Sequence, residues 1–249
     1  MNYFQPLILR EWYEFRKHII SNLLFWILTP IILHIFLAIP LSRFISMDIR
    51  YLNWSAGGIW ITTSGMTAFL QSAYRMRKIQ FESRQVEALL KSPISNLDLL
   101  SINIARGMMY GIGQFCFAIL ITSTLNHEYL SIGSILIISF QMLTLIFHFS
   151  VMGTFLGLLI SNAMLLTNIS FFLFIFITMG LGNFIPLENY PNSYLAVIEN
   201  IPTTTAFANI KSVIIHSPFN WYGFSFTLLG SIILFIITLI SSHKIFRKI

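Results

Sequence analysis

Residues that could take part in polar chemistry are concentrated in one stretch of the chain, residues 74–106. This stretch lies between two long uncharged runs and holds nine of the 24 charged residues, namely Arg75, Arg77, Lys78, Glu82, Arg84, Glu87, Lys91, Asp98 and Arg106. Side chains of both signs, on an amphipathic pattern that stops at Ser92-Pro93, are suited to ion pairing with a soluble partner protein. We therefore interpret this segment as the seat of function and the rest of the chain as the frame that positions it.

Patterns typical of catalysis or nucleotide binding are missing from the sequence. It contains no G-x-x-x-x-G-K-[ST] phosphate loop, no H-E-x-x-H and no G-x-S-x-G. We therefore expect no catalytic residue, no metal ligand and no cofactor-binding residue in this chain. His34 and His148 are candidates for a proton relay inside the apolar runs, but neither has a carboxylate partner there, so we interpret both as packing residues. If the protein moves a solute against a gradient, we expect another subunit to supply the energy.

The composition predicts an integral membrane protein. Of the 249 residues, 56% are hydrophobic and 10% are charged, whereas an ordinary soluble domain has about 25% charged residues. Five runs lack Asp, Glu, Lys and Arg: residues 18–42, 51–74, 107–127, 129–187 and 212–243. The fourth run has 59 residues, enough for two helices of about 20 residues each, so six spans are expected. We expect no nucleic-acid partner, because no soluble basic module is present.

The expected fold class is all-α integral membrane, with one domain over residues 1–249. The six spans are predicted at residues 19–40, 52–73, 107–125 and 131–159, then a fifth that ends near 185, and a sixth at 221–241. Pro30 is expected to kink the first span. Three further segments complete the chain: an interfacial amphipathic helix at 1–18, the cytoplasmic segment at 74–106, and an outer segment at 186–218 with short re-entrant helices at 193–199 and 205–216.

The placement of Lys and Arg predicts the orientation in the membrane. With the N-terminus inside, 12 of the 15 cations fall on inner segments, and only Arg43, Arg50 and Lys211 fall on outer ones. We expect a multi-pass protein of the inner (cytoplasmic) membrane with both termini in the cytoplasm. The first apolar run is of full length and precedes no A-x-A-like site, so we interpret it as a retained span. The single cysteine, Cys116, lies mid-span, and disulfides are not expected.

Within residues 74–106 the pattern predicts a short surface helix. Four apolar residues fall close to one helical face: Ile79, Val86, Leu89 and Leu90. Ser92-Pro93 then ends the helix, because proline disfavours helical geometry in the residue before it. Asn96-Leu97-Asp98 can begin the next helix. A solvated loop with ordinary juxtamembrane charges fits the same spacing, and both interpretations stay open on spacing alone.

Residues 82–95, with the sequence E-S-R-Q-V-E-A-L-L-K-S-P-I-S, resemble the signature E-R-x-x-G-[ST]-x-E-x-L-L-x-[ST]-P-[IV]-S of the ABC-2 permease family. These permeases are the six-span membrane subunits of bacterial ATP-driven exporters. Residues 51–59 resemble the family's Y-x-x-F-x-x-P-G-[IL] entry to the second span, and residues 183–191 resemble its F-x-P-x-x-x-[LY]-P pattern after the fifth. N-I-P-T at 200–203 is similar to its N-P-[LT]-T turn with one residue inserted. Gln85-Val86 replaces the usual glycine and threonine, and Ala56 or Gly57 stands where proline is usual.

The resemblance implies a subunit that forms a translocation path and is driven by a separate ATPase. Its partners would be two copies of an ABC ATPase subunit, which bind ATP and Mg²⁺, a second permease subunit as a homodimer, and the lipid bilayer. By position, the ATPase contact would comprise Glu82, Arg84, Glu87, Leu89, Leu90, Ser92 and Pro93, with Trp12 and Arg16 near it. The extracellular gate would include Pro186, Glu188, Pro191 and Pro202. The expected substrate is a lipophilic drug-like molecule, a lipid or a lipid-linked glycan.

Two other classes of protein stay open. A stand-alone channel or ion-driven carrier would purify without an ATPase, and an integral-membrane enzyme would need a polar cluster within the spans. The glycine pairs Gly107/Gly111 and Gly153/Gly157 have the G-x-x-x-G spacing of a helix contact. Packing within one chain is the favoured interpretation of these pairs, and a contact between two subunits is the alternative.

Overall fold

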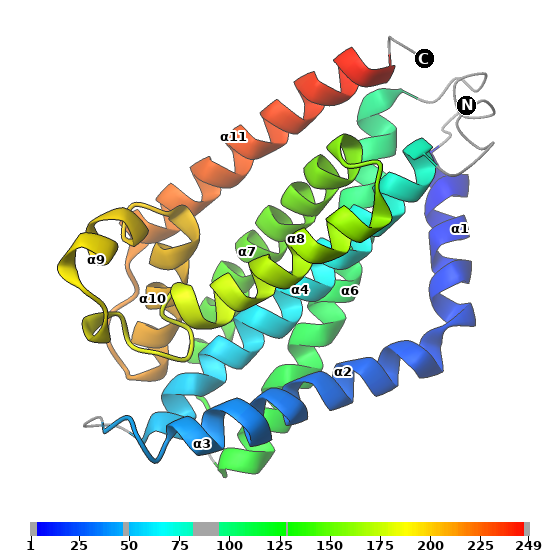
Figure 1. The fold of residues 1–249 in the computed structure, drawn as a ribbon. Helices are drawn as coiled ribbons and strands as arrows, with labels where there is room; N and C mark the ends of the chain where they lie inside the picture. The colour runs from blue at the N-terminus through cyan, green and yellow to red at the C-terminus, as the bar shows by residue number, and fades with distance from the viewer. Residues whose placement is uncertain (1–3, 47–49, 82–94, 128, 247–249) are drawn as a thin grey trace.

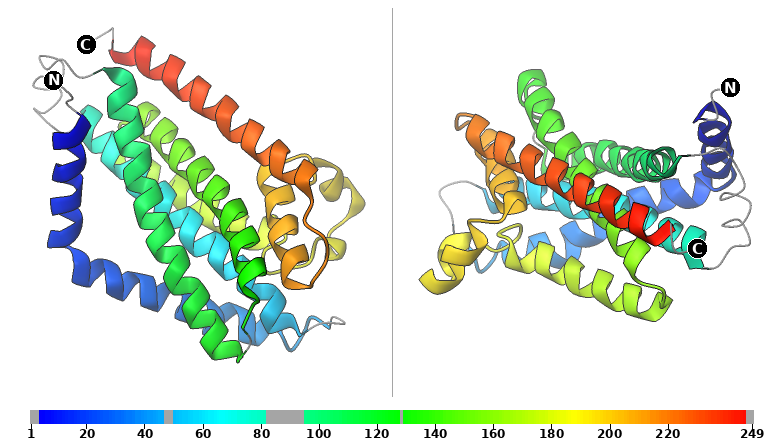
Figure 2. Two further views of the ribbon diagram at one scale, coloured as in Figure 1. Left: turned by 180° about the vertical axis from the view of Figure 1, so that it is seen from behind. Right: turned by 90° about the horizontal axis from the view of Figure 1, so that it is seen from above.

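The computed structural model describes residues 4–46, 50–81, 95–127 and 129–246, and over these residues the chain is helical without a strand. α1 (Phe4–Lys17) lies at one side of a bundle of long helices (Figure 1). The bundle consists of α2 (Ile19–Leu33) continued by η1 (His34–Ala38) and α3 (Ile39–Leu41), α4 (Tyr51–Phe81), α6 (Asn96–Asn126), α7 (Ile132–Leu159), α8 (Ala163–Ile175) continued by η2 (Phe176–Gly180), and α11 (Trp221–Phe246). Three short helices, η3 (Leu187–Asn189), α9 (Asn192–Ile198) and α10 (Pro202–Ile214), lie on the side away from α1 (Figures 1 and 2).

Five helices are long and apolar enough to cross a bilayer: Ile19–Leu41, Asn96–Asn126, Ile132–Leu159, Ala163–Gly180 and Trp221–Ile245. Large apolar side chains such as Phe36 and Phe172 are exposed on the outside of the bundle. Polar side chains such as Asn103, Gln114 and Gln141 are buried inside it. An apolar exterior around a partly polar interior suits a hydrocarbon environment, where polar groups must find partners within the protein. The expected all-helical, membrane-embedded class agrees with this arrangement.

α4 is the central helix of the bundle. It packs mainly along α6 and α7 and also contacts α2, α8 and α10. Every residue from 54 to 69 is buried, and many of them are glycine, serine or threonine, which let neighbouring helices approach closely. The same small and polar residues make α4 less apolar than the five helices above. It nevertheless covers the whole of the predicted second span, residues 52–73.

Pro30 lies inside α2, within the predicted first span. A proline has no N–H to donate to the carbonyl four residues earlier, which here belongs to Trp26. Gln114 of α6 donates its Nε2–H to that carbonyl at 3.1 Å. The Trp26 ring packs on Gly113, where an added Cβ would collide with it. The backbone group left free by proline is thus satisfied by a side chain of the neighbouring helix.

The predicted cytoplasmic segment at 74–106 consists, where it is described, of two helix ends. α4 continues to Phe81, and Ile79 is buried in it at 4% exposure, so its assignment to a separate surface helix was wrong. The predicted start of the next helix at 96–98 is confirmed. Ser95 and Asp98 form a capping box, in which Asp98 N–H donates to Ser95 Oγ at 3.1 Å. Residues 82–94 lie outside the described residues.

The first, second, fourth and sixth spans begin within one residue of the predicted positions, whereas α4 and α11 continue past the predicted ends at 73 and 241 to Phe81 and Phe246. The turn at 161–162 is confirmed, with Asn162 capping α8, and α9 and α10 begin and end close to the two predicted outer pieces. The fifth span was expected to reach residue 185, but its helix ends at Gly180. Gly182 adopts a left-handed φ of 75°, which turns the chain back toward the bundle.

Both glycine pairs contact α4 of the same chain. A Cβ added at Gly107 or Gly111 would collide with α4, and one at Gly153 or Gly157 would strike the α4 backbone. Packing within one chain, the favoured interpretation, is confirmed for these four positions.

Candidate functional site

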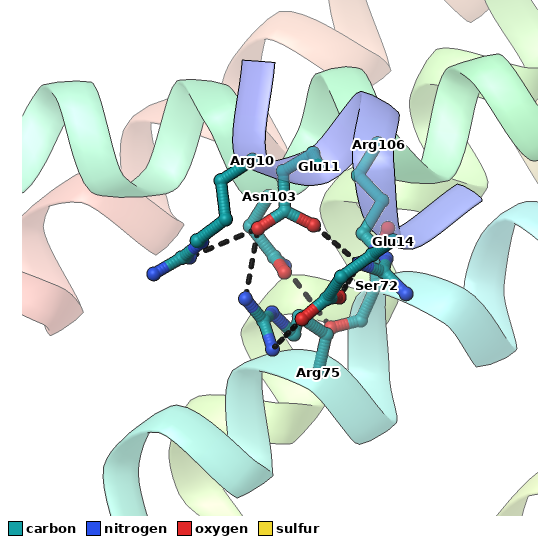
Figure 3. A network of polar contacts seen from close by, with 7 residues as sticks. All are labelled: Arg10, Glu11, Glu14, Ser72, Arg75, Asn103 and Arg106. Carbon is teal, nitrogen blue, oxygen red and sulfur yellow. Dashed lines mark hydrogen bonds and ion pairs between the residues drawn. The ribbon is translucent and has the colours of Figure 1, made fainter. Parts of the chain in front are cut away.

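A cluster of charged side chains joins three helices at the end of the bundle where α4 ends and α6 begins (Figure 3). This arginine–glutamate cluster consists of Arg10, Glu11 and Glu14 of α1, Arg75 of α4 and Arg106 of α6. Side chains three residues apart are neighbours on a helix, so the two glutamates of α1 act together. The cluster fixes α1 to the two helices that border residues 82–94.

Glu11 is the centre of the cluster. Its side chain is 8% exposed, and its Oε1 accepts hydrogen bonds from Arg75 at 2.8 Å and from Arg10 at 2.9 Å. Its Oε2 accepts from Arg106. Arg106 also donates to Glu14 at 2.8 Å, and Arg75 lies 3.8 Å from the other oxygen of Glu14. Charge-assisted bonds of this kind are about twice as strong as neutral ones.

The surrounding cations keep both carboxylates ionised. Burial by itself raises the pKa of Glu11, but Arg75, Arg10 and Arg106 outweigh it and hold that pKa below its usual value. Burial also raises the pKa of Glu14, and Arg106 and Arg75 again bring it below the usual value. At neutral pH the cluster therefore combines three cations with two anions, and Glu11, Arg75 and Arg106 form its enclosed part.

An aromatic cluster supports α1 on the same side. Phe15 is buried against Trp26 of α2 and Tyr110 of α6, with ring centroids 5.9 and 5.3 Å away. The Arg106 guanidinium lies 5.4 Å from the centre of the Tyr110 ring. Since Glu11 and Phe15 are four residues apart, one face of α1 makes both the ionic and the aromatic contacts.

A second polar layer lies beside the arginine–glutamate cluster. Asn103 of α6 donates to the Ser72 carbonyl of α4 at 3.0 Å and to Thr154 of α7 at 2.9 Å. Further along α4, Arg77 donates to the carbonyl of Ser161 at 2.9 Å, in the turn between α7 and α8. These contacts let α4 continue as a helix through its arginines, where the sequence suggested an exposed segment.

The residues predicted to contact an ATPase fall into two groups. Trp12 is 51% exposed on α1 and stacks on Phe15 with ring centroids 5.7 Å apart, and Arg16 is exposed. The others lie outside the described residues: Glu82, Arg84, Glu87, Leu89, Leu90, Ser92 and Pro93.

The predicted gate residues begin three successive short helices on the opposite side of the molecule. Pro186 precedes η3, which contains Glu188, and Pro191 precedes α9. Pro202 is the first residue of α10, and its carbonyl accepts a hydrogen bond from Thr227 of α11 at 2.9 Å. A proline at or just before the first residue of a helix favours a helix start there, because its φ angle is fixed close to the helical value.

Lys211 of α10 is a buried cation that the sequence suggested only as an outer charge. Lys211 is 6% exposed, and its Nζ lies 3.4 Å from the centre of the Trp54 ring of α4. Nζ donates to the carbonyls of Gly182 and, at 2.8 Å, Asn183. Burial lowers the pKa of Lys211 well below its usual value, and Glu188 opposes this. Lys211 thereby joins α10 to α4 and to the turn after η2.

An apolar cavity of about 470 Å³ lies between α2, α4 and α8. Phe25 and Ile32 of α2, Met66 of α4 and Phe171 of α8 line it, together with several threonines. At one end Tyr74 and Thr167 share a hydrogen bond of 2.6 Å. Its size and apolar walls are those of a site for a small lipophilic molecule.

Glu11 was not predicted as a functional residue. Arg75 and Arg106 were predicted only as members of the charged stretch 74–106 and as inner cations, without a partner inside the chain. The signal for Glu11 is the pair of glutamates three residues apart in a basic, amphipathic segment. Across the described residues, no group of three His, Cys, Asp or Glu side chains could hold a metal ion. No protein-family model matches the sequence, and no curated protein matches it closely enough to count as a relative.

Proposed function

We propose that this chain is the membrane subunit of an ABC-type exporter, a member of the ABC-2 permease family that works as a homodimer with two ATPase subunits. The observation that carries the proposal is the attachment of α1, by enclosed ion pairs, to both α4 and α6. These two helices border residues 82–94, the segment whose sequence resembles the family's ATPase contact. A force applied by a partner to this segment would therefore reach two core helices and α1 together.

In this proposal α4 is the sixth membrane crossing. At about 1.5 Å per residue, its 31 residues make a helix of roughly 46 Å, longer than the ~30 Å hydrocarbon core. Its polar stretch can cross because the surrounding helices bury it. With six crossings both termini would lie on the same side, and the distribution of Lys and Arg favours the cytoplasm for that side. α1 would then lie on the inner leaflet of the inner membrane, and α9 and α10 on the outer side.

The work would be divided between the subunits. ATP and Mg²⁺ bind to the ATPase, and this chain has no catalytic role. The charges of Glu82, Arg84 and Glu87 pair with the ATPase rim, and Leu89 and Leu90 fill an apolar groove on it. Closure of the ATPase dimer then moves α4 and α6, and the outer segment that contains Pro186 and Pro202 opens.

The apolar cavity supports a lipophilic substrate. It lies between α2, α4 and α8, and two of these helices, α2 and α8, belong to segments that are apolar enough to cross the hydrocarbon core. Threonine hydroxyls in its wall can orient a ligand that carries one or two polar atoms. We propose that this cavity belongs to the path taken by a drug-like molecule, a lipid or the lipid part of a lipid-linked glycan.

Copurification tests the proposal. The tagged chain is purified from its native membranes, and the copurifying proteins are searched for a P-loop ATPase. Glu87→Arg and Leu89→Asp should reach the membrane in normal amounts but lose the ATPase subunit or its stimulated ATP hydrolysis. Glu199→Arg, a matched change at an exposed position after α9, should keep both.

Two outcomes would contradict the exporter proposal. The first is a chain that always purifies without an ATPase, which would favour a stand-alone channel or an ion-driven carrier. The second is unchanged ATPase stimulation in both coupling variants, which would remove residues 82–94 from the contact.

A further inference from the structure

A groove with a volume of about 730 Å³ lies between the first turn of α6 and the last turns of α11, at the end of the bundle where these two helix ends come close together (Figures 1 and 2). Its walls are mainly apolar, with Leu97 on the α6 side and Leu239 and Ile240 on the α11 side. Leu239 also packs on a buried cluster formed by α4, α6 and α7. The groove is therefore backed by the core of the bundle.

The groove opens onto a strip of α11 that faces the surroundings of the bundle. Ile233, Ile236, Ile237 and Ile240 are between 44% and 57% exposed, and their spacing of three and four residues places them on one face of the helix. α11 is among the helices that are apolar enough to cross a bilayer, so this face meets hydrocarbon. Because Ile240 belongs both to the strip and to the groove, an acyl chain that lies on the strip can enter the groove without leaving apolar surface.

The rim of the groove is cationic. His243 and Lys244 line it in the last turn of α11, and both are exposed. Within the described part of the chain, Lys244 is the only Asp, Glu, Lys or Arg among the residues that line the groove. The cation at the end of a helix that crosses the membrane lies at the level of the lipid phosphates.

The α6 side of the rim does not supply the charge. Ser95 caps the start of α6, and its Oγ–H donates to Oδ2 of Asp98 at 2.7 Å. Asp98 N–H donates back to Ser95 Oγ at 3.1 Å. Because this capping box already contains a carboxylate, Lys244 of α11 is the source of the positive charge at the rim.

We propose that this groove binds an anionic phospholipid, with its phosphate at His243 and Lys244 and an acyl chain against Leu97, Leu239 and Ile240. Apolar walls beside a cationic rim complement a molecule that is apolar along most of its length and negative at one end. A free phosphate would meet the charge but leave the apolar walls uncovered. A zwitterionic lipid would bring a cation of its own close to Lys244.

The phospholipid is a bound partner and not the cargo proposed for the apolar cavity, because that cavity lies between α2, α4 and α8. The groove is complete without an ATPase subunit. The test of the lipid site is therefore separate from that of the exporter proposal.

Native mass spectrometry of the delipidated full chain in a non-ionic detergent tests the site. Phosphatidylglycerol and phosphatidylcholine with the same acyl chains are titrated separately, and the dissociation constants of the first bound lipid are compared. Phosphatidylglycerol should bind roughly fivefold more tightly, as one charge contact at a membrane surface predicts. An excess of inorganic phosphate should not displace it.

Lys244→Gln should lower the affinity for phosphatidylglycerol to that for phosphatidylcholine. Lys78→Gln, at an exposed position in the last turn of α4, is the matched control and should keep the preference. Leu97→Gln should weaken the binding of both lipids alike, because it changes an apolar wall and not the rim.

Four outcomes would overturn the proposal. The wild type could bind both lipids equally well, or inorganic phosphate could displace the lipid. Lys244→Gln could lose no more affinity than Lys78→Gln, which would assign the preference to the general positive charge of this end of the bundle. Unchanged binding of both lipids in Leu97→Gln would remove the acyl chain from the groove.

Discussion

Glu11 makes contacts that reach far beyond its own helix. It pairs with Arg75, 64 residues away, and with Arg106, 95 residues away, and its side chain is almost enclosed. Loss of one partner from an enclosed ion pair leaves the other charges without compensation. At the residue scale, this one carboxylate therefore holds α1 on the bundle.

Glu11→Gln should lower the free energy of unfolding by roughly 1–3 kcal/mol, because Arg75 and Arg106 lose a charged acceptor. Glu14→Gln is the matched control and should cost less, since Glu14 is more exposed. Thermal unfolding of the purified protein in one detergent measures both. Equal losses in the two variants would mean that Glu11 has no special position in the cluster.

The cluster also predicts a pH dependence. The pKa values of Glu11 and Glu14 are below the ordinary value of 4.5 in the folded protein. Their contribution to stability is therefore present above the pKa of the unfolded chain and is lost as the pH falls through the lower, folded pKa values. Unfolding curves between pH 7 and pH 3 should show stability falling at the acid end, and less steeply in Glu11→Gln. The same slope in wild type and variant would contradict this.

Lys211→Met should loosen the outer segment. The methionine keeps the volume but leaves the carbonyls of Gly182 and Asn183 without their donor. Hydrogen exchange should become faster at residues 181–186 and in α10, whereas Lys211→Arg should lie between the variant and the wild type. Exchange that stays unchanged in Lys211→Met would show that these contacts do not hold the turn.

At the scale of helices, α2 and α6 depend on each other through a proline. Pro30 frees the carbonyl of Trp26, and Gln114 of α6 donates to it. A helix break inside a membrane needs such a partner, because no water is there to replace it. The pair therefore acts as one structural unit formed by two helices.

A double-mutant cycle tests this unit. Gln114→Leu should lower the melting temperature in the wild-type background, where the carbonyl of Trp26 loses its donor. In the Pro30→Ala background the helix can satisfy that carbonyl itself. There, Gln114→Leu should lower the free energy of unfolding by about 1 kcal/mol less than it does in the wild-type background. Additive effects in the cycle would show that Gln114 serves another purpose.

The arrangement of the whole molecule depends on whether α4 crosses the membrane. If α4 crosses, five crossings separate α1 from α9, so the two helices lie on opposite sides of the membrane. If only the five most apolar helices cross, four crossings separate α1 from α9, and the two lie on the same side. In a Cys116→Ala background, Tyr13→Cys and Val197→Cys report on exposed positions of α1 and α9. A maleimide that cannot cross membranes should label Val197→Cys from outside the cell and Tyr13→Cys only in inverted vesicles. Labelling of both from one side would remove α4 from the crossings.

Much of the fold could be predicted because its causes are local in sequence. The fourth span, predicted at 131–159, forms the helix α7, and Ser95 and Asp98 cap α6 from three residues apart. The candidate site could not be predicted in this way. Ile79 and Arg75 looked exposed because they belong to a charged stretch, yet both are enclosed by helices distant in sequence.

The sequence by itself determined that the chain is helical and apolar, and where most of its helices begin and end, because hydropathy and capping act within a few residues. It also singled out the charged stretch 74–106, within which residues 82–95 resemble the ABC-2 permease signature. Only the tertiary structure decided which charges are enclosed. Glu11 finds its arginines, and Lys211 its carbonyls, because helices far apart in sequence pack together, and a buried polar group must take its partner from whatever the packing brings to it.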